Sequence, residues 1–388
     1  MRKILAITAV SRFVHLRVLV LPICLLCVLC GYSPAQDFKT VRNGIEYAEV
    51  TREISGLKVN MNLLRLDLKK VRLDIYHAMD AAIGTETTSA IAIKHGAFAA
   101  INSGFFRLDK SPFLGDAAGM LVIDGKVLSE ATNDRIQLLI DNKPNRTDVA
   151  MARTVFSQTL KFGRETIEVD GIDRERKKDD LVIYTPEFGR TTLTGGDGIE
   201  VVIIKGNVAS MSSELGNTVI PPNGFVISAS GISVEKLSAV VKNNSSVTLT
   251  NTWEGLPSDL IKDRAKLDVV AGAPQLIKNS KIDITWEQEK SSKSFVETRH
   301  PRTAVAKLRD GKFLMITVDG RTESSGGIGL RDLAEYLLSL GATDAMNLDG
   351  GGSTTMFLDG KVVNHPSDKE GERKVSDAIL VTQRLKRK

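Results

Sequence analysis

The sequence contains few cysteines, and all of them lie close to its N-terminus. The three cysteines among the 388 residues are Cys24, Cys27 and Cys30. If a leader ending at residue 35 is removed, the mature chain has no thiol for a disulfide, a thiolate metal site or a cysteine nucleophile. A chain of this length can bury a hydrophobic core large enough to fold without such cross-links. We therefore expect packing alone to hold the fold together.

The sequence also has little net charge outside this leader. Four of the 52 lysines and arginines, but none of the 47 acidic residues, lie in residues 1–35. The rest of the chain carries 48 basic against 47 acidic residues, so the pI of about 8.9 is mostly an effect of the leader. A chain without a basic excess lacks the electrostatic footprint of a nucleic-acid-binding protein. We expect no nucleic-acid partner.

The N-terminal hydrophobic run, residues 18–30, is too short for a membrane-spanning helix. Such a helix needs about 20 apolar residues, and Pro22 interrupts this run. Basic residues precede the run and the small-x-small sequence Ser33-Pro34-Ala35 follows it, a pattern typical of a secretory signal peptide. We predict a signal peptide over residues 1–35, cleaved near Ala35, with no stable membrane span after processing. The mature protein is then expected to be exported, as a periplasmic, extracellular or envelope-associated protein; a lipoprotein attached through Cys30 stays open.

Strand patterns dominate the remaining chain. Residues 40–80 alternate between apolar and polar side chains, as half-buried strands do. Residues 88–96 and 330–341 are predicted to be helices, and Gly341 is a stop signal for the second. This second helix lies between two strands, which predicts one βαβ crossover near the C-terminus. We predict an α+β fold, a strand-rich mixed-sheet domain with few helices.

The chain divides into four predicted parts. They are a signal peptide (1–35), an N-terminal strand region (36–90), a large domain (91–383) and a short basic tail (384–388). The candidate functional residues all fall in the large domain, and the strand region is left without an assigned role.

The stretch NLDGGGSTTMF, residues 347–357, places three glycines between two apolar runs. A strand that ends at Asp349 delivers this acid to a sheet edge. Gly350, Gly351 and Gly352 can adopt positive φ angles and present backbone N–H groups without side chains in the way. Such a turn can approach an anion or a sugar ring closely, and Ser353 adds a hydroxyl group. A plain tight turn is the alternative, but it requires fewer glycines.

A second acidic corner has the same form. Asp319 ends the strand of ITVDGR and is followed by Arg321, with Glu323 nearby. Because the strands ending at Asp319 and Asp349 flank one crossover helix, we expect the two acids to lie close together. Paired carboxylates at a concave edge are the usual equipment for cleaving glycosidic bonds.

Two further segments offer binding groups. In RHPRTAVAKL, Arg302 and its neighbours precede a strand, and arginine forks suit phosphate or carboxylate groups. In INSGFF, Asn102 ends a buried strand, and Gly104 is followed by Phe105 and Phe106. An aromatic ring near a sugar site can stack on the sugar, although core packing is the alternative and is expected for at least one of the two rings.

These segments together resemble a known family. The blocks INSGFF, PRTA, DGR and NLDGGGS occur, with other blocks between residues 91 and 382, in the order seen in phosphodiester glycosidase domains. This family contains the bacterial relatives of the lysosomal uncovering enzyme, which removes N-acetylglucosamine from a sugar phosphodiester. Ala306 stands where the family usually has glycine.

The resemblance implies an exported hydrolase that cleaves the glycosidic C–O bond of a sugar 1-phosphodiester, with a glycosyl phosphodiester or an envelope or host glycan as substrate. The residues that match the family's motif positions are Asn102, Arg302, Thr303, Asp319, Arg321, Asp349, Gly350, Gly351, Gly352 and Ser353. We predict Asp349 and Asp319 as catalytic residues, with Glu323 as a third candidate acid from its place in the sequence. The other matching residues are predicted to bind the substrate or its phosphate, and their sequence neighbours Gly104, Phe105 and Asn347 are added as candidates. No cofactor is required, although a divalent cation is compatible. The residues leave open which carboxylate is the base and whether the configuration at the anomeric carbon is retained.

Two alternative functions remain. One is a metal-dependent phosphodiesterase or phosphotransferase that attacks phosphorus, with the metal held by Asp319, Asp349 and Asn347. The other is a non-catalytic glycan-binding module of the cell envelope. The glycosidase and these two alternatives are distinguished by whether a substrate is turned over and by which bond is broken.

Overall fold

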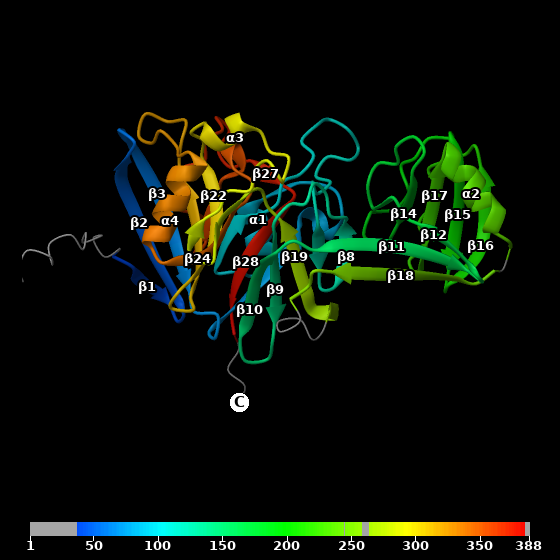
Figure 1. Ribbon diagram of the computed structural model, residues 1–388, viewed down its shortest axis with the longest axis horizontal. Helices are drawn as coiled ribbons and strands as arrows, with labels where there is room; N and C mark the ends of the chain where they lie inside the picture. The colour runs from blue at the N-terminus through cyan, green and yellow to red at the C-terminus, as the bar shows by residue number, and fades with distance from the viewer. Residues whose placement is uncertain (1–36, 244, 258–263, 385–388) are drawn as a thin grey trace, which may run out of the picture. The chain divides into compact units, whose positions relative to one another are not determined.

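The computed structural model describes residues 37–384, apart from residue 244 and residues 258–263 (Figure 1). Residues 38–388 form one compact unit. The predicted signal peptide with its three cysteines, and all but the first residue of the predicted basic tail, lie outside the described residues. Among the described residues, no helix has the length and apolar character needed to cross a membrane.

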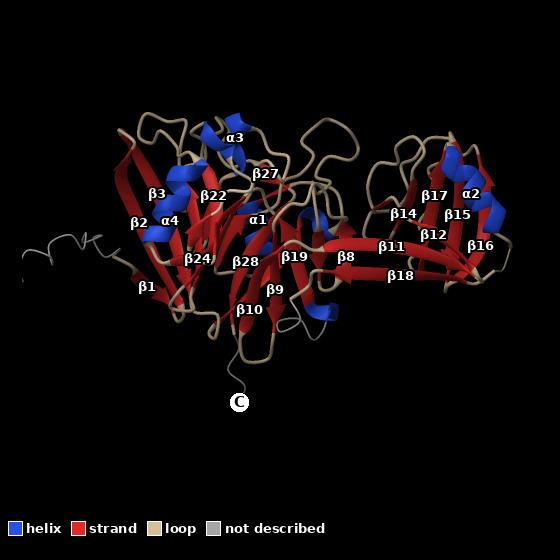
Figure 2. Ribbon diagram, in the orientation of Figure 1, coloured by secondary structure: helices blue, strands red, loops and turns tan. Residues whose placement is uncertain are grey.

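Strands make up far more of the described chain than helices do, which confirms the predicted strand-rich fold (Figure 2). The described residues form four α-helices: α1 (Thr88–Lys94), α2 (Ile232–Val240), α3 (Lys293–Glu297) and α4 (Leu330–Ser339). They also form three 3-10 turns: η1 (Ala78–Asp80), η2 (Arg264–Lys266) and η3 (Gly351–Ser353). Helices α1 and α4 match the two predicted helical segments, and Gly341, with φ of +91°, follows α4 as expected.

The largest sheet has eight strands, and three of the predicted site residues, Arg302, Thr303 and Asn347, lie on it. In spatial order the strands are β1 (Lys39–Arg42), β2 (Ile45–Ile54), β3 (Leu57–Leu66), β23 (Phe313–Val318), β22 (Arg302–Leu308), β24 (Ala342–Asn347), β20 (Gln275–Lys278) and β21 (Lys281–Ile282). The N-terminal strands β1–β3 are therefore built into the same sheet as β22–β24.

Two five-stranded sheets pack against this one. The first has the order β26 (Lys361–Val362), β25 (Met356–Leu358), β6 (Ala99–Asn102), β28 (Asp377–Gln383) and β4 (Val71–His77). The second has the order β10 (Thr147–Ala152), β9 (Gln137–Asn142), β19 (Leu267–Ala271), β7 (Leu121–Ile123) and β8 (Lys126–Ser129). A short pair joins β27 (Lys374–Val375) to β5 (Glu86–Thr87).

The remaining strands form two sheets within residues 155–254. One has the order β12 (Glu165–Glu168), β11 (Val155–Phe162) and β18 (Val247–Glu254). The other has the order β13 (Gly171–Ile172), β14 (Leu181–Tyr184), β17 (Gly224–Ser230), β15 (Gly198–Ile204) and β16 (Asn207–Ser213). These strands share their own apolar cluster, which includes Leu160, Val201 and Ile227.

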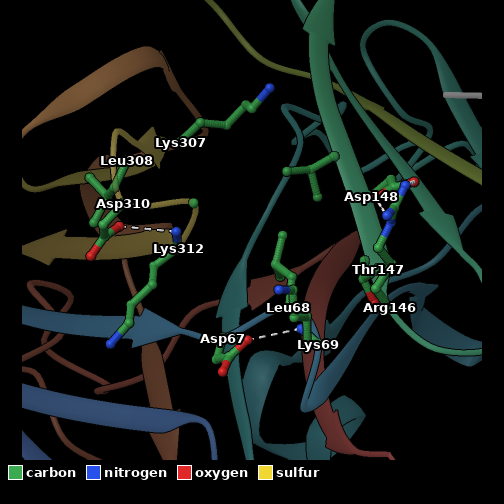
Figure 3. Close-up of a pocket in the computed structure, with 12 residues that line it drawn as sticks. Asp67, Leu68, Lys69, Arg146, Thr147, Asp148, Lys307, Leu308, Asp310 and Lys312 are labelled. Carbon is green, nitrogen blue, oxygen red and sulfur yellow. Dashed lines mark hydrogen bonds and ion pairs between the residues drawn. The ribbon is translucent and has the colours of Figure 1, made fainter. Parts of the chain in front are cut away.

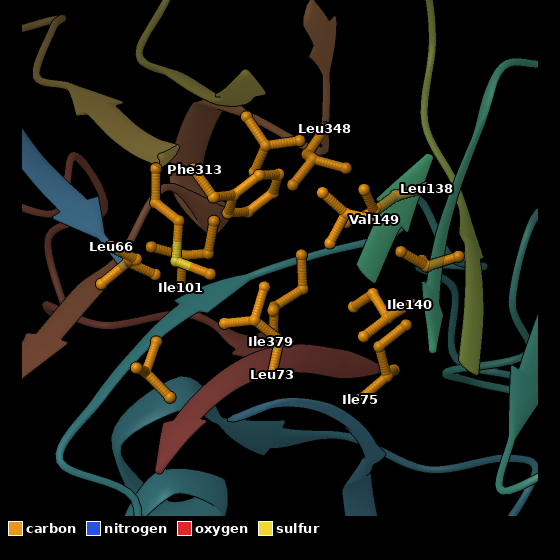
Figure 4. Packing of buried hydrophobic residues seen from close by; sticks show 14 of the residues in the cluster. Leu66, Leu73, Ile75, Ile101, Leu138, Ile140, Val149, Phe313, Leu348 and Ile379 are labelled. Atoms are coloured by element: carbon orange, nitrogen blue, oxygen red, sulfur yellow. The ribbon is translucent and has the colours of Figure 1, made fainter. Parts of the chain in front are cut away.

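The main core lies between the eight-stranded sheet and the two five-stranded sheets. Phe313 and Leu66 of the large sheet pack with Ile101 and Ile379 of one partner sheet and with Ile140 of the other (Figure 4). The outer face of the large sheet is covered by α4, whose buried leucines share an apolar cluster with that sheet. Strand β23 is buried along its whole length because both of its faces are covered.

The topology of the large sheet decides where the acidic corners lie. Strands β23 and β24 are each antiparallel to β22, which lies between them, so they run parallel to each other. Helix α4 connects them in the chain. The C-terminal ends of β23 and β24 and the N-terminal end of β22 therefore meet at one edge of the sheet. This edge receives Asp319, Asp349 and Arg302.

Candidate active site

Asp349 is held in place by its own backbone and by its neighbours. Its N–H donates to the Ser103 carbonyl (2.9 Å), and its carbonyl accepts from the Asn102 side-chain amide (2.7 Å). The Gly350 N–H donates to Asp349 Oδ1 (2.9 Å). Asp349 is half-buried as a residue. These contacts hold its carboxylate in a fixed orientation beside the glycine turn.

The surroundings of Asp349 raise the pKa of its carboxyl group toward neutral pH. Burial raises the pKa of Asp349 to about 6, although the Ser353 hydroxyl and the Gly350 N–H lower this pKa. Arg373 lowers it further, and the charge of Asp377 raises it. The Ser353 hydroxyl lies beside the carboxylate but does not form a hydrogen bond of good geometry with any described residue. A carboxylate with such a pKa is mostly ionised at pH 7 and can accept a proton.

Glycine is required at position 350 because another backbone segment lies close to it, and at position 351 because of its positive φ angle. A Cβ atom on Gly350 would lie 2.7 Å from the Pro301 carbonyl oxygen. Gly351 has φ of +61°, and its N–H donates to the same carbonyl (2.9 Å). A Cβ atom on Gly351 would lie 3.2 Å from the guanidinium of Arg321. The turn therefore brings bare backbone against a cationic side chain, as the glycine run predicts.

Gly352 leaves room for a second cation. A Cβ atom there would collide with Arg373 Nη2 and with Asp368 Oδ1. Arg373 forms a two-pronged ion pair with Asp368, through Nε (2.7 Å) and Nη2 (3.0 Å). The glycine turn is thus flanked by Arg321 and Arg373. Arg373 is not among the predicted site residues, because a single arginine in a polar loop carries no local signal.

Asp377 is a second carboxylate close to Asp349, and it was also missed. It begins β28, is 1% exposed, and accepts from the Gly104 N–H (2.6 Å) and the Ser376 hydroxyl (2.5 Å). Gly104, predicted to approach the substrate, therefore approaches Asp377 instead. Its Cβ position lies 3.2 Å from Asp377 Oδ1, so the absence of a side chain makes this contact possible.

Asn102 and Thr303 hold the site together rather than face it. Asn102 is fully buried; its Oδ1 accepts from the Thr303 hydroxyl (2.7 Å) and from the Thr355 N–H (3.1 Å). Its amide nitrogen donates to the carbonyl of Asp349. This one side chain links β6, β22 and the segment after the glycine turn, so we treat it as a positioning residue.

Asp319 occupies the same sheet edge but has different surroundings. Its N–H donates to the Asn60 carbonyl (2.9 Å), and its Oδ1 accepts from the His365 N–H (3.0 Å) and the Asn364 side chain (3.3 Å). Burial raises the pKa of Asp319, while the His365 N–H and Asn364 lower it. Asp319 is only 5% exposed. It is better placed to organise the edge than to meet bulk water.

Arg302 does not present a free guanidinium to a ligand. It is 1% exposed, and it donates to the carbonyls of Phe295 (2.6 Å), Thr298 (2.9 Å) and Ile328 (3.3 Å). Burial, with a smaller contribution from Arg321, lowers the pKa of Arg302 to about 10. The geometry gives Arg302 a structural role, in place of the phosphate contact predicted from the sequence.

We expect Arg302→Ala to lower the free energy of unfolding by about 2–4 kcal/mol, because three buried carbonyls lose a charged donor. Urea denaturation measures the change. Arg331→Ala serves as the control, because Arg331 lies on the exposed side of α4 and its side chain is 74% exposed. If the Arg302 variant is as stable as the wild type and binds only charged substrates more weakly, then Arg302 contacts the substrate and its structural role is wrong.

Arg321 fits the role of a ligand-facing cation better. It is exposed, has φ of +60°, and lies within hydrogen-bonding distance of His300 Nδ1 (3.2 Å). Burial, and then Arg302 and Arg321, lower the pKa of His300, so a neutral imidazole can accept from Arg321. This contact turns the guanidinium of Arg321 toward Gly351.

Two other predicted residues, Glu323 and Asn347, make no contact with the Asp349 carboxylate. Glu323 is exposed in the turn between Thr322 and Ser325, and it forms no side-chain hydrogen bond or ion pair with the described residues. The Asn347 amide nitrogen donates to the carbonyls of Ala273 (2.7 Å) and Leu348 (2.8 Å), which fixes the end of β24. Neither contact pattern supports a direct catalytic role.

Phe105 lies on the side of the site that Arg135 occupies. The Arg135 guanidinium lies 5.3 Å from the centre of the Phe105 ring, and Phe295 packs edge-on at 6.1 Å. Burial lowers the pKa of Arg135, while Glu289 and Asp349 raise it, so Arg135 feels the charge of Asp349. Phe106 packs against an apolar cluster instead, as expected for one of the two rings.

Several buried polar atoms near the glycine turn have no hydrogen-bond partner among the described residues. They are Ser103 Oγ, Asn347 Oδ1, Ser353 Oγ, Thr354 Oγ1 and Thr355 Oγ1. Buried hydroxyl groups are rarely left unpaired, and such a cluster is typical of a site that holds ordered water or a ligand.

The metal-dependent alternative was tested against the same geometry. Within the described ranges, no three histidine, cysteine, aspartate or glutamate side chains converge to hold a metal ion. Asp319 is engaged by Asn364 and by a backbone N–H, and the Asn347 amide faces two carbonyls. The three residues proposed as metal ligands therefore do not form a ready ligand set.

A cavity of about 500 Å³ lies far from this edge (Figure 3). It is lined by the turns that connect β3 to β4, β9 to β10 and β22 to β23, with Asp67, Arg146 and Lys312 among its residues. Arg302 begins β22, whereas Leu308 of the cavity ends it, so the cavity and the candidate site lie at opposite ends of this strand. We do not assign the chemistry to this cavity.

Comparison with known proteins relates part of this chain to one family. Residues 198–382 match the model of the family described as phosphodiester glycosidase. The resemblance predicted from the motifs is confirmed. This match contains Asp319, Asp349 and Asp377, whereas Asn102 and Arg135 precede it.

The similar proteins include named enzymes of this phosphodiester glycosidase family. N-acetylglucosamine-1-phosphodiester alpha-N-acetylglucosaminidase from Bos taurus is 38% identical over 111 residues, which is 26% of this chain and 21% of the enzyme. The Homo sapiens enzyme of the same name is 36% identical over 111 residues, with the same shares. The matched stretch thus spans about a fifth of the length of these relatives.

Two solved structures share the fold over most of this chain. A "hypothetical protein" from Synechocystis has a TM-score of 0.76 and 21% identity, covering 90% of this chain and 64% of that one. A "Putative exported protein" from Burkholderia pseudomallei has a TM-score of 0.72 and 25% identity, covering 84% of this chain and 74% of that one. Both likenesses extend well beyond residues 198–382.

Proposed function

We propose that this protein is an exported hydrolase that cleaves the glycosidic C–O bond of a sugar 1-phosphodiester. The observation that carries the proposal is the placement of the Asp349 carboxylate beside a bare glycine turn, with the guanidinium groups of Arg321 and Arg373 at that turn. The names of the bovine and human relatives give the same class of reaction. Export is inferred from the predicted signal peptide and from the likeness to the Burkholderia pseudomallei protein.

The reaction adds water across the bond between the anomeric carbon and the phosphate oxygen. As this bond breaks, positive charge develops on the sugar and negative charge on the departing phosphate. The phosphate monoester leaves with the bonding electrons, and water supplies the hydroxyl group of the free sugar. A phosphate is already a good leaving group, so a strong general acid is less important than in ordinary glycosidases.

The residues at the turn suit these charges. Asp349, ionised near pH 7, can stabilise the positive sugar or take a proton from the attacking water. Arg321, whose guanidinium lies beside Gly351, can stabilise the departing phosphate, whereas the Gly350 and Gly351 N–H groups already donate to Asp349 Oδ1 and to the Pro301 carbonyl. Burial is the main cause of the raised pKa of Asp349, and the charge of Asp377 adds a smaller contribution in the same direction. We assign the reacting role to Asp349 and supporting roles to Asp377 and Asp319.

Hydrolysis in oxygen-18 water tests the proposal. The substrate is a methyl phosphodiester of N-acetylglucosamine 1-phosphate, tested together with the corresponding glucose and galactose compounds. Label in the released sugar indicates C–O cleavage and supports the proposal. Label in the phosphate, with activity lost to a chelator, establishes the metal-dependent phosphodiesterase instead. Binding without any turnover establishes the glycan-binding module.

The pH dependence of the reaction follows from Asp349. The reacting form is the carboxylate, and its pKa is raised to about 6, so activity is lost as the pH falls through this value. We expect kcat/KM to decline by about tenfold per pH unit below that point, because one proton is taken up. A pH–rate profile measures this limb, with fluorescence at each pH to confirm that the protein stays folded. A profile that is flat between about pH 5 and 7 is incompatible with this role.

A further inference from the structure

A second cavity lies beside Asp319, between the N-terminal strands and the hairpin of β25 and β26. Its volume is about 480 Å³, and its lining includes Tyr47, Glu49, Phe98, Asp359, Lys361 and Val363. Tyr47 and Glu49 belong to β2, so this wall comes from the N-terminal strand region, which has no assigned role.

Each wall of the cavity is linked to a strand or loop that also binds Asp319. On one side, the Tyr47 hydroxyl donates to Asn62 Oδ1 (2.6 Å), and Asn60, two residues earlier, accepts the Asp319 N–H. On the other side, Val363 lines the cavity and precedes Asn364, whose side chain donates to Asp319 Oδ1. Asp319 does not line the cavity, but it lies close enough to Tyr47 and Glu49 for their charges to interact.

A row of polar residues crosses the sheet from the cavity toward the site. Glu49 pairs in register with Asn62, Asn62 with Thr317, and Thr317 with Thr303. Thr317 is fully buried, and its hydroxyl has no hydrogen-bond partner among the described residues. Such a row is unexpected inside an apolar sandwich, because an unpaired buried hydroxyl destabilises the fold.

The polar groups of this cavity are free to bind a ligand. Glu49, Asp359 and Lys361 form no side-chain hydrogen bond or ion pair with other described residues. Two carboxylates and one ammonium group, mounted beside aromatic and aliphatic surface, suit the hydroxyl groups and apolar faces of a neutral sugar. Two acids against one base do not suit a phosphate, whose cationic partners lie at the glycine turn.

We propose that this cavity is a carbohydrate subsite that holds a sugar unit of the substrate beside Asp319. The proposal rests on the proposed function, because it assigns the sugar and the phosphate of one substrate to two adjoining regions. Tyr47 supplies the aromatic wall, and its hydroxyl is fixed by Asn62. Glu49 and Lys361 supply the hydrogen-bonding groups that select the sugar.

Saturation-transfer NMR on the full mature chain tests the subsite without turnover. The probes are glucose, galactose, N-acetylglucosamine and the β-1,4 disaccharide of N-acetylglucosamine. We expect at least one probe to bind, and Tyr47→Ala and Glu49→Gln each to weaken its binding by about tenfold, as loss of a sugar-stacking ring or a paired hydroxyl does. Glu53→Gln is the control, because Glu53 lies on the same strand but does not line the cavity.

The outcomes separate this proposal from the proposed function. Hydrolysis that proceeds while no probe shows binding dependent on Tyr47 or Glu49 overturns the subsite alone. Probe binding that depends on these residues, without hydrolysis of any phosphodiester, keeps the subsite as a sugar-binding site and overturns the enzyme. Circular dichroism of each variant ensures that lost binding does not reflect lost folding.

Discussion

Asp349→Asn is expected to reduce turnover by roughly 10²–10⁴-fold, because the amide can neither take a proton nor stabilise a positive sugar as a carboxylate does. The substitution keeps the shape of the side chain and its contact with the Gly350 N–H. Rates are measured on the glycosyl phosphodiester that the wild-type protein hydrolyses fastest. A nearly normal rate in this variant would remove Asp349 from the mechanism.

The stability of the same variant gives a second test. Because the folded-state pKa of Asp349 is raised to about 6, the stability contributed by its protonated form is present at low pH and is lost as the pH rises through this value. An asparagine side chain does not ionise, so the variant does not lose this stability as the pH rises. At pH 8 its free energy of unfolding should exceed that of the wild type by on the order of 1–2 kcal/mol. Asp310→Asn, in the exposed turn between β22 and β23, is the control for both measurements.

Gly351→Val is expected to damage both the turn and the catalytic rate. A β-branched residue at φ of +61° costs about 1–3 kcal/mol in backbone strain. Its side chain would also crowd the guanidinium of Arg321, which lies 3.2 Å from the Cβ position. We expect a loss in kcat/KM of roughly 10²-fold, because a displaced cation no longer faces the departing phosphate.

Gly341→Val separates the two effects. Gly341 has φ of +91°, but no atom lies within 4 Å of its Cβ position, and it ends α4 away from the glycine turn. This variant should therefore lose stability through strain while its kcat/KM stays close to that of the wild type. Urea denaturation and steady-state kinetics of both variants make the comparison. Equal kinetic effects of the two substitutions would show that the turn does not contact the substrate.

The glycine turn illustrates what local sequence can predict. Three consecutive glycines after a strand-ending acid indicate a close approach, and the structure provides a distinct reason for each of them: Pro301 at Gly350, positive φ at Gly351, and Arg373 with Asp368 at Gly352. The helix before this strand was equally clear from its periodicity and its terminal glycine. Features of this kind depend on neighbours within a few residues.

Arg302 illustrates the opposite case. Beside a proline at the start of a strand it looked like a phosphate ligand, but its guanidinium donates to carbonyls that the fold brings around it. Asp377 and Arg373 were overlooked for the same reason. Asp377 contacts Gly104 and Arg373 contacts Gly352, and these contacts place them at the site. The contact between Asp377 and Gly104 joins residues 273 positions apart in the sequence.

By itself the sequence determined the strand-rich fold, the two helices, the acidic corners and the family resemblance, because each depends on periodicity, turn chemistry or motif order along the chain. Only the tertiary structure decided which side chains can meet a ligand and which are used to hold the site. A polar group's role depends on whether its hydrogen bonds are already satisfied, and its partners come from strands that are distant in sequence and adjacent in the sheet.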